Sequence, residues 1–199
     1  MYKEIMLDYV DLVPYINSVL LNNHLKIYKK NLFLLNKLLK QVNYDYSYSI
    51  KDLISRIDIF PLSVRGEILY YLSSILNHNL YFYNISNNGK TEPIKTIKKA
   101  IDKYFGSYVN FIQEFIKQAM SLKGSGYTFL VKDDNGILKI INTSNEDSPY
   151  YYGYEAIICL DLWEHAYFLQ YKDNKLDYIN NFFKILDFEK INRYYEKLL

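Results

Sequence analysis

The stretch CLDLWEHAYFLQYK, residues 159–172, contains the only Trp of the chain and one of its three His. It begins at the end of an apolar run typical of a strand, in which Ile157, Cys159 and Asp161 alternate onto one face. A carboxylate at the end of an apolar strand needs a partner, because burying it unpaired is costly. His165 follows four residues after Asp161, so the histidines of the chain are candidates for a site shared with this carboxylate.

The two other histidines also lie in apolar settings. His24 falls on one predicted long helix and His78 toward the end of a second. Together with Asp161 and His165 they would make a metal site of three His and one Asp, a ligand set that suits iron or manganese and, less exclusively, zinc. The residues alone leave another interpretation open. A His on an apolar face is commonly a core residue, Asp161 is a favoured helix N-cap, and Glu164 could pair with His165.

The composition argues against several classes of protein, among them nucleic-acid-coating, disulfide-bonded and membrane proteins. The chain has 199 residues and is half hydrophobic, which is enough for one large domain or two small ones sharing a core. Its net charge of +2 argues against coating of nucleic acid, so no nucleic-acid partner is expected. One cysteine excludes an intrachain disulfide. The first residues resemble no signal peptide and no apolar run reaches membrane-spanning length, so we expect no membrane partner and a cytoplasmic location.

The first half of the chain is predicted to be helical. Apolar residues recur at helical spacing from Ile16 to about Val42 and again from about Val64 to Tyr83, which predicts a helical hairpin. The polar stretch NISNNGKTEP, residues 84–93, contains Gly and Pro as breakers and is the best boundary candidate. We therefore predict an N-terminal domain over residues 1–88 and a C-terminal domain over residues 89–199.

The second half is predicted to be mixed. IKTIKKAIDKYF and YVNFIQEFIKQAMSL are typical of two amphipathic helices separated by Gly106. YTFLVKD and ILKIINTS flank the hairpin signal Asp-Asp-Asn-Gly at 133–136, EAIICLDLW predicts a third strand, and the remainder returns to helix. The predicted fold class is α+β: a long N-terminal α-helical hairpin followed by a C-terminal α/β domain with a three-stranded antiparallel sheet.

Several segments together resemble a known family. DLWEHAYFLQYK is similar to the Asp-x-Trp-Glu-His-Ala-Tyr signature of the iron/manganese superoxide dismutases. AIDKYFGSYVNFIQEFIKQAMSLKGSGYTFLV resembles the central block of that family, and NHNLYFY, TSNEDSP and LVPYI resemble further segments, so the likeness covers nearly the whole chain. The resemblance implies an enzyme that converts its substrate superoxide to dioxygen and hydrogen peroxide, with one Fe or Mn ion per subunit as cofactor.

The resemblance also implies the ligands. His78, Asp161 and His165 fall on three ligand positions, and reading forward from PYI without gaps puts His24 on the fourth. A competing alignment makes His24 the entrance His of the family and puts Leu20 on the ligand position, which leaves three ligands.

The entrance position separates the two alignments. In the family the entrance His pairs with the second Tyr after Trp-Glu-His-Ala, and here that position is Phe168. An entrance His at position 24 would therefore lack its partner. With His24 as a ligand the entrance position is Tyr28, and both members of the pair have changed together, so we prefer this alignment.

Other positions depart from the family pattern. The outer-sphere Gln of the family comes from one of two places, which Ser74 and Glu146 occupy here, and the Tyr near the open face corresponds to Leu32. A pocket-lining Trp is replaced by Tyr127, whereas Trp163 matches a Trp that walls the pocket. Beyond the ligands, the residues predicted to take part in the reaction are Glu146, Tyr28, Trp163 and Tyr127.

The resemblance implies a partner and leaves one alternative function. Family members pair through the Glu of Trp-Glu-His, so we predict a homodimer in which Glu164 reaches His165 of the partner subunit. The changed outer-sphere positions concern proton delivery and redox tuning rather than ligation. The alternative is therefore a non-catalytic structural or assembly protein that retains the superoxide dismutase fold.

Overall fold

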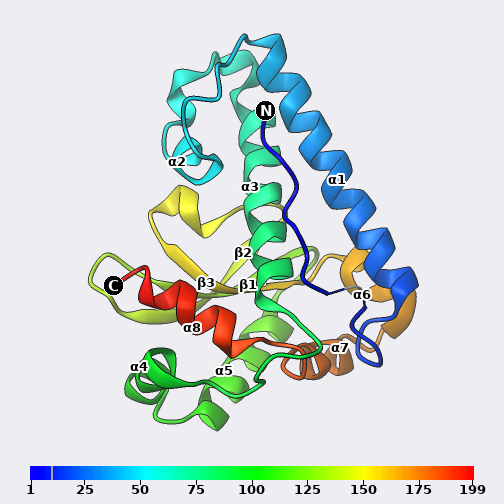
Figure 1. Cartoon of the computed structure of the whole chain (residues 1–199), viewed down its shortest axis with the longest axis vertical. Coiled ribbons are helices and arrows are strands. Elements are labelled where there is room, and N and C mark those ends of the chain that lie inside the picture. The colour runs from blue at the N-terminus through cyan, green and yellow to red at the C-terminus, as the bar shows by residue number, and fades with distance from the viewer. Residues whose placement is uncertain (10) are drawn as a thin grey trace.

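The N-terminal half of the computed structural model, which describes residues 1–9 and 11–199, is a helical hairpin. Its two long helices are α1 (Ser18–Gln41) and α3 (Leu62–Asn84), which pack against each other (Figure 1). They are joined through a short helix α2 (Ile50–Ile54) and the 3-10 turn η1 (Ile57–Ile59). The predicted hairpin is confirmed, with helix ends within two residues of those expected.

The buried face of α1 follows directly from its sequence. The helix begins where the Asn17 side chain accepts a hydrogen bond of 2.9 Å from the backbone N–H of Leu20, as an N-cap residue does. Its buried positions then recur every three or four residues, the spacing of one helical face; they are Leu20, Leu21, His24, Tyr28, Leu32, Leu35 and Leu39. His24 therefore points from α1 toward α3 with the apolar residues around it.

The C-terminal half is built around a three-stranded sheet. Its order is β2-β1-β3 and both pairings are antiparallel, which confirms the predicted α+β fold class. The bounds are α4 (Lys95–Phe105), α5 (Tyr108–Ser121), β1 (Gly126–Lys132), β2 (Leu138–Ser144), η2 (Pro149–Tyr152), β3 (Glu155–Asp161), α6 (Glu164–Tyr171), α7 (Lys175–Phe182) and α8 (Phe188–Glu196).

The sheet lies between the hairpin and the pair α4 and α5 (Figure 1). Helix α3 packs against β3, and α5 packs against β1 and β2. Because α1 contacts both α3 and α6, the helices that carry the three histidines meet at the end of β3. The fold thus brings four segments that are distant in sequence to one place.

One side chain completes the outer edge of β3. Asn84, the last residue of α3, is fully buried; its Nδ2 donates to the Ile157 carbonyl over 3.1 Å, and its Oδ1 accepts from the Cys159 N–H over 2.9 Å. These two bonds replace a neighbouring strand on the free side of β3. The chain then crosses to α4, and the division at residues 88 and 89 stays a prediction.

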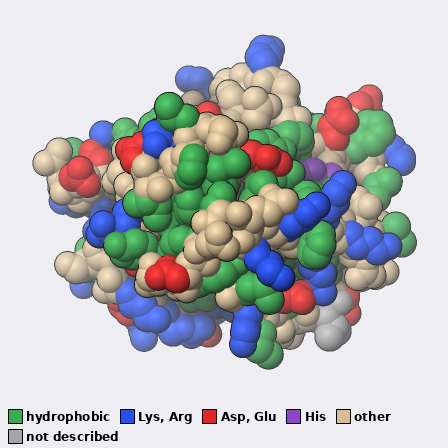
Figure 2. Space-filling view, turned by 90° about the horizontal axis from the view of Figure 1, so that it is seen from above, with side chains coloured by type: hydrophobic (Ala, Val, Ile, Leu, Met, Phe, Trp, Pro, Cys, Tyr) green, Lys and Arg blue, Asp and Glu red, His purple; other side chains and the backbone are tan. Residues whose placement is uncertain are grey.

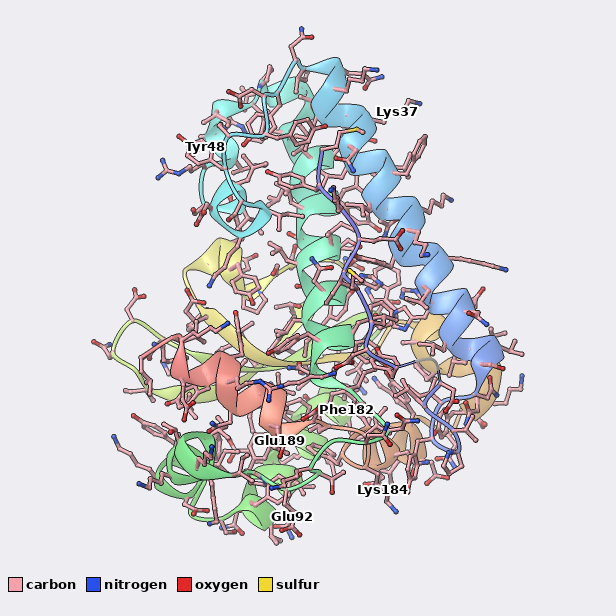
Figure 3. All side chains as sticks on the ribbon, in the orientation of Figure 1. Lys37, Tyr48, Glu92, Phe182, Lys184 and Glu189 are labelled. Carbon is pink, nitrogen blue, oxygen red and sulfur yellow. The ribbon has the colours of Figure 1, made fainter. Side chains whose placement is uncertain are left out.

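The interior is filled mainly by apolar and aromatic side chains, and only a few ionisable ones, such as Asp161 and Glu146, are buried with them. Figure 3 shows side chains filling the space between the hairpin and the sheet, while Lys37 near the end of α1 points outward. Figure 2 shows charged side chains of both signs interspersed with hydrophobic ones on the face seen from above. Among the described residues, no helix is both long and apolar enough to cross a membrane.

Candidate metal centre

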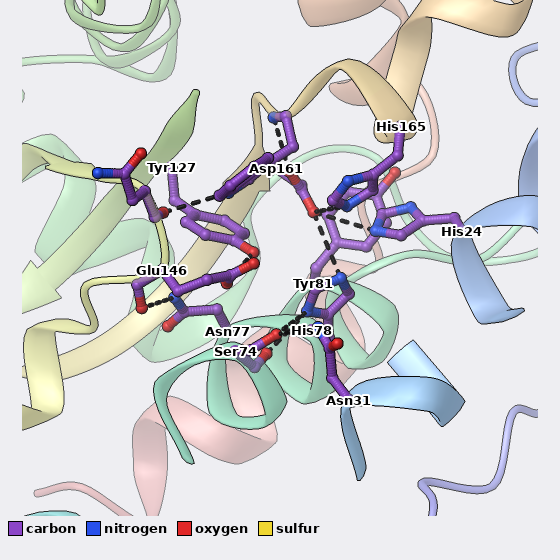
Figure 4. Close-up of polar contacts among 12 residues, drawn as sticks. His24, Asn31, Ser74, Asn77, His78, Tyr81, Tyr127, Glu146, Asp161 and His165 are labelled. Carbon is purple, nitrogen blue, oxygen red and sulfur yellow. Dashed lines mark hydrogen bonds and ion pairs between the residues drawn. The ribbon is translucent and has the colours of Figure 1, made fainter. Parts of the chain in front are cut away.

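Four side chains from four elements converge at the end of β3. They are His24 from α1, His78 from α3, Asp161 from β3 and His165 from α6 (Figure 4). The Nε2 atoms of the three histidines lie 3.0, 3.7 and 3.4 Å, in that order, from the single atom Asp161 Oδ2. One potential ligand atom from each of the four residues falls within 4.8 Å of all the others. The sequence prediction named these four residues.

Hydrogen bonds outside the cluster fix the direction of two members. His78 Nδ1 donates to the Ser74 carbonyl over 2.7 Å, which leaves the Nε2 lone pair of His78 facing inward. Asp161 Oδ1 accepts from the Trp163 N–H over 2.8 Å, so that Oδ2 is the oxygen that faces the histidines. Outer partners of this kind are what orient the ligands of a metal ion.

The cluster contains polar atoms without partners. His78 Nε2 and His165 Nε2 are buried and form no hydrogen bond to any described residue. Buried polar groups are normally paired, so these two atoms need a further explanation. A cation held among three imidazole nitrogens and one carboxylate oxygen supplies it, because such nitrogen and oxygen donors suit iron and manganese. The three histidines and Asp161 therefore form a ligand set that fits an iron or manganese ion.

Burial and mutual contacts set the protonation of the cluster. Burial lowers the pKa of His24, and the hydrogen bond that its Nε2 donates to Asp161 only partly offsets this. Burial together with the nearby His24 lowers the pKa of His78 to about 3. Burial alone would raise the pKa of Asp161, but the charge of His165 and the hydrogen bond and charge of His24 hold it well below its usual range. Burial alone would lower the pKa of His165, but the charge of Asp161 raises it. A metal ion binds neutral imidazoles and an ionised carboxylate, so its binding would release a proton held by His165.

The two alternatives from the sequence can be compared with the geometry. The alternative that Asp161 caps the next helix is wrong, because α6 begins at Glu164 with Trp163 as its N-cap residue and has no side-chain cap. Leu20, the ligand position of the competing alignment, is an apolar residue buried in the core. The cluster contains His24, which supports the preferred alignment.

Glu146 lies beside the cluster rather than in solvent. It follows β2 in a polar turn but is only 4% exposed, and its Oε2 accepts a hydrogen bond of 2.7 Å from Tyr127 Oη. Asn77 on α3 holds the backbone of the turn by donating to the Glu146 carbonyl over 3.2 Å. Burial raises the pKa of Glu146 to about 7, although the hydrogen bond from Tyr127 opposes the rise. A carboxyl group that can hold a proton near neutral pH therefore adjoins the cluster.

Tyr28 lies next to the cluster but directs its hydroxyl elsewhere. Its ring centre is 6.0 Å from that of His78. Its Oη donates to Asn79 Oδ1 over 2.7 Å and accepts from the Ile5 N–H over 2.8 Å. Tyr28 therefore ties the N-terminal segment to α3 beside the site, an arrangement that helical spacing gives no means of predicting.

Trp163 and Phe168 lie on the side of the cluster formed by α6. The Trp163 ring stacks on His165 at 5.7 Å between centres, and its Nε1 donates to the Asn145 carbonyl over 3.2 Å. Trp163 therefore forms a wall beside His165. Phe168 lies further along α6 and is 47% exposed.

One polar contact was absent from the sequence predictions. Asn31 Nδ2 on α1 donates to Ser74 Oγ on α3 over 2.8 Å (Figure 4). Sequence spacing gave no signal for it, because the partners are 43 residues apart and an Asn on a helix face is usually solvent-exposed.

Comparison with known proteins agrees with this geometry. A family profile described as iron/manganese superoxide dismutases, C-terminal domain, matches residues 93–194. A superoxide dismutase [Fe] from Legionella pneumophila is 33% identical over 179 residues, covering 89% of both chains. The chain belongs to the iron/manganese superoxide dismutase family. A superoxide dismutase [Mn] from Thermus aquaticus is 29% identical over 97% of this chain and 95% of its own length, and one from Listeria monocytogenes is 33% identical over 75% and 74%.

The likeness confirms the resemblance that the Trp-Glu-His-Ala-Tyr block indicated. The profile of the superoxide dismutase family covers α4 to most of α8, which includes Asp161, His165 and Glu146 but not the hairpin. The relatives extend the likeness over the helical hairpin that carries His24 and His78. The family therefore accounts for both halves of the fold that meet at the cluster.

Proposed function

We propose that the chain disproportionates superoxide to dioxygen and hydrogen peroxide at one iron or manganese ion held by His24, His78, Asp161 and His165. The observation that carries this proposal is the convergence of three Nε2 atoms on Asp161 Oδ2, two of them buried without a hydrogen-bond partner among the described residues. Family membership supports the same activity.

The metal ion would supply one-electron chemistry by alternating between its trivalent and divalent states. The residues of the chain prepare the site for it. Asp161 contributes the negative charge, with Oδ1 held by the Trp163 N–H so that Oδ2 faces inward. The Ser74 carbonyl holds His78 Nδ1, which keeps its Nε2 free to ligate.

Proton handling falls to Glu146 and Tyr127. Conversion of two superoxide ions to dioxygen and hydrogen peroxide takes up two protons. The carboxyl of Glu146 can hold a proton near neutral pH because burial raises its pKa to about 7. Tyr127 Oη fixes the orientation of that carboxyl through its bond to Oε2. Trp163 stacks on His165 and forms a wall of the site on that side.

We further propose that the protein is a homodimer. Glu164 is exposed in the first turn of α6, next to His165, which keeps a partly exposed edge. A carboxylate from one subunit can accept a hydrogen bond from His165 of the partner subunit and so fix the tautomer and orientation of that ring.

The decisive experiment compares three preparations of the full chain: metal-free, iron-loaded and manganese-loaded. Metal content is measured by elemental analysis and superoxide decay by its ultraviolet absorbance after a pulse. We expect about one ion per subunit and faster decay in at least one loaded form only. An ion bound without faster decay in either form would favour the non-catalytic alternative, and failure to bind an ion would contradict the proposed site.

A further inference from the structure

A cavity of about 300 Å³ lies against α3, and none of the four residues of the metal centre lines it. Its floor is formed by Leu76, Asn79, Leu80 and Tyr83, which have the spacing of one face of α3. Figure 1 shows the N-terminal segment, α2 and α8 placed around this helix. The cavity is therefore a second concave site, of a size that small molecules occupy in proteins.

The walls of this cavity are mostly apolar and aromatic. The side chains of this kind that line it are Ile5, Leu76, Leu80, Tyr83, Tyr150 and Tyr194. The rings of Tyr83 and Tyr194 meet edge to face with their centres 6.0 Å apart. Tyr150 Oη donates to the Ala156 carbonyl over 3.3 Å and lies 3.2 Å from Tyr194 Oη. These contacts hold the tyrosines in place, so they form a prepared surface on which a flat ring can pack.

The charges at this cavity are positive. Lys51 and Lys197 line it, and none of the described residues that line it is acidic. Lys51 Nζ lies 5.2 Å from the centre of the Tyr150 ring and pairs with Glu155, which is outside the lining. Lys197, at the end of α8, is exposed and forms no ion pair with any described residue. An apolar cavity with a free ammonium group at its edge complements a molecule that has a flat apolar body and one negative charge.

We propose that this cavity binds a planar aromatic carboxylate, with the ring against Leu76, Leu80 and Tyr83 and the carboxylate at Lys197. The inference goes beyond the proposed function, because neither superoxide nor the metal ion takes part in this binding. A carboxylate without a ring would gain only an exposed ion pair with Lys197, which contributes little. A ring without a carboxylate would leave Lys197 unused. Both parts of the ligand are therefore needed for its full affinity.

Two residues that line the cavity also contact the tyrosine beside the metal centre. Tyr28 Oη donates to Asn79 Oδ1 over 2.7 Å and accepts from the Ile5 N–H over 2.8 Å. The centre of the Tyr28 ring is 6.0 Å from that of His78. Tyr28 thus stands between the cavity and the metal centre. A test therefore has to distinguish a carboxylate in the cavity from one bound at the metal ion.

The test is calorimetric titration of the full chain as purified, with its metal content measured, using 2-naphthoate as the probe. We expect a dissociation constant on the order of 0.1–1 mM. The neutral 2-naphthamide, which keeps the shape, and acetate, which keeps the charge, should each bind at least about fivefold more weakly. Lys197→Gln should weaken binding of 2-naphthoate by a similar factor. Lys37→Gln, which removes an exposed lysine of α1, is the matched control and should leave binding unchanged (Figure 3).

Two further measurements locate the ligand. Ile5→Trp fills the cavity while its backbone N–H stays available to Tyr28, so binding of 2-naphthoate should be lost. A crystal structure of the complex should show the ring against Tyr83 and the carboxylate at Lys197.

Three outcomes would overturn the proposal: equal affinity for 2-naphthoate and 2-naphthamide, unchanged binding in Lys197→Gln, or 2-naphthoate seated at the metal ion. If Ile5→Trp does not fold, Lys197→Gln and the crystal structure of the complex decide. Calorimetry detects binding whether or not superoxide decays, so failure of this site and failure of the proposed function give different results.

Discussion

Replacing Glu146 by Gln is predicted to change how stability depends on pH. Burial raises the pKa of this carboxyl from 4.5 to about 7 in the folded chain, whereas the unfolded chain keeps the lower value. Because the pKa of Glu146 is higher in the folded chain, protonated Glu146 contributes to the free energy of unfolding. This contribution is fully present below the unfolded pKa and is lost as pH rises through the folded pKa. A pKa rise of about 2.5 units at about 1.4 kcal/mol per unit gives about 3.5 kcal/mol for the complete titration, of which about 3 kcal/mol falls above pH 4.5.

The assay is urea unfolding of the metal-free full chain from pH 4.5 to pH 8. Wild type should lose about 3 kcal/mol of unfolding free energy relative to Glu146→Gln across this range, because Gln stays neutral. Differences between the two proteins cancel the titration of groups that they share. Glu114→Gln, at an exposed position on α5, serves as the matched control and should follow wild type. A constant difference between wild type and Glu146→Gln at all pH values would refute the reasoning.

Three further predictions concern the site and the assembly. His24→Ala should lose stoichiometric metal in elemental analysis, because one of four ligands is gone; full occupancy would instead favour the alignment in which His24 is not a ligand. Glu164→Ala should weaken both the dimer and metal retention, measured by sedimentation and elemental analysis, and a strictly monomeric wild type at micromolar concentration would contradict the proposed interface. The superoxide decay rate should fall as pH rises through the titration of Glu146 near 7, since the ionised carboxylate can only accept hydrogen bonds and repels an anionic substrate. Glu146→Gln at matched metal content should flatten that fall, and superimposable profiles would show that Glu146 has no such role.

Local patterns were sufficient to predict most of the fold. The helical spacing of apolar residues gave α1 and α3, and strand alternation with the Asp-Asn-Gly turn gave the β1–β2 hairpin. These patterns depend only on residues close together in the chain, so they can be recognised in a single sequence. The third strand was expected to continue through Trp163 but ends at Asp161, because the Asp161 side chain accepts the Trp163 N–H and the chain turns into α6.

The candidate site was predictable only where residue type restricts the chemistry. The chain has only three His, and these together with one Asp in an apolar setting limit the possible metal ligands. The structure brings all four side chains together. The contacts around them depend on side chains that meet across long sequence separations, such as Asn31 with Ser74 and Tyr127 with Glu146. Glu146 lies in a polar turn that suggests solvent exposure, but α3 and Tyr127 of β1 contact it and it is buried.

The position of Asn84 has a consequence for the behaviour of the chain at high concentration. β3 is at the margin of its sheet, and an unpaired margin is a template on which a second chain can add a strand and begin to aggregate. The Asn84 amide occupies the Ile157 carbonyl and the Cys159 N–H that such a strand would use, and α3 covers the place where it would lie. The residue that ends the second long helix thus also keeps a further strand from pairing with β3.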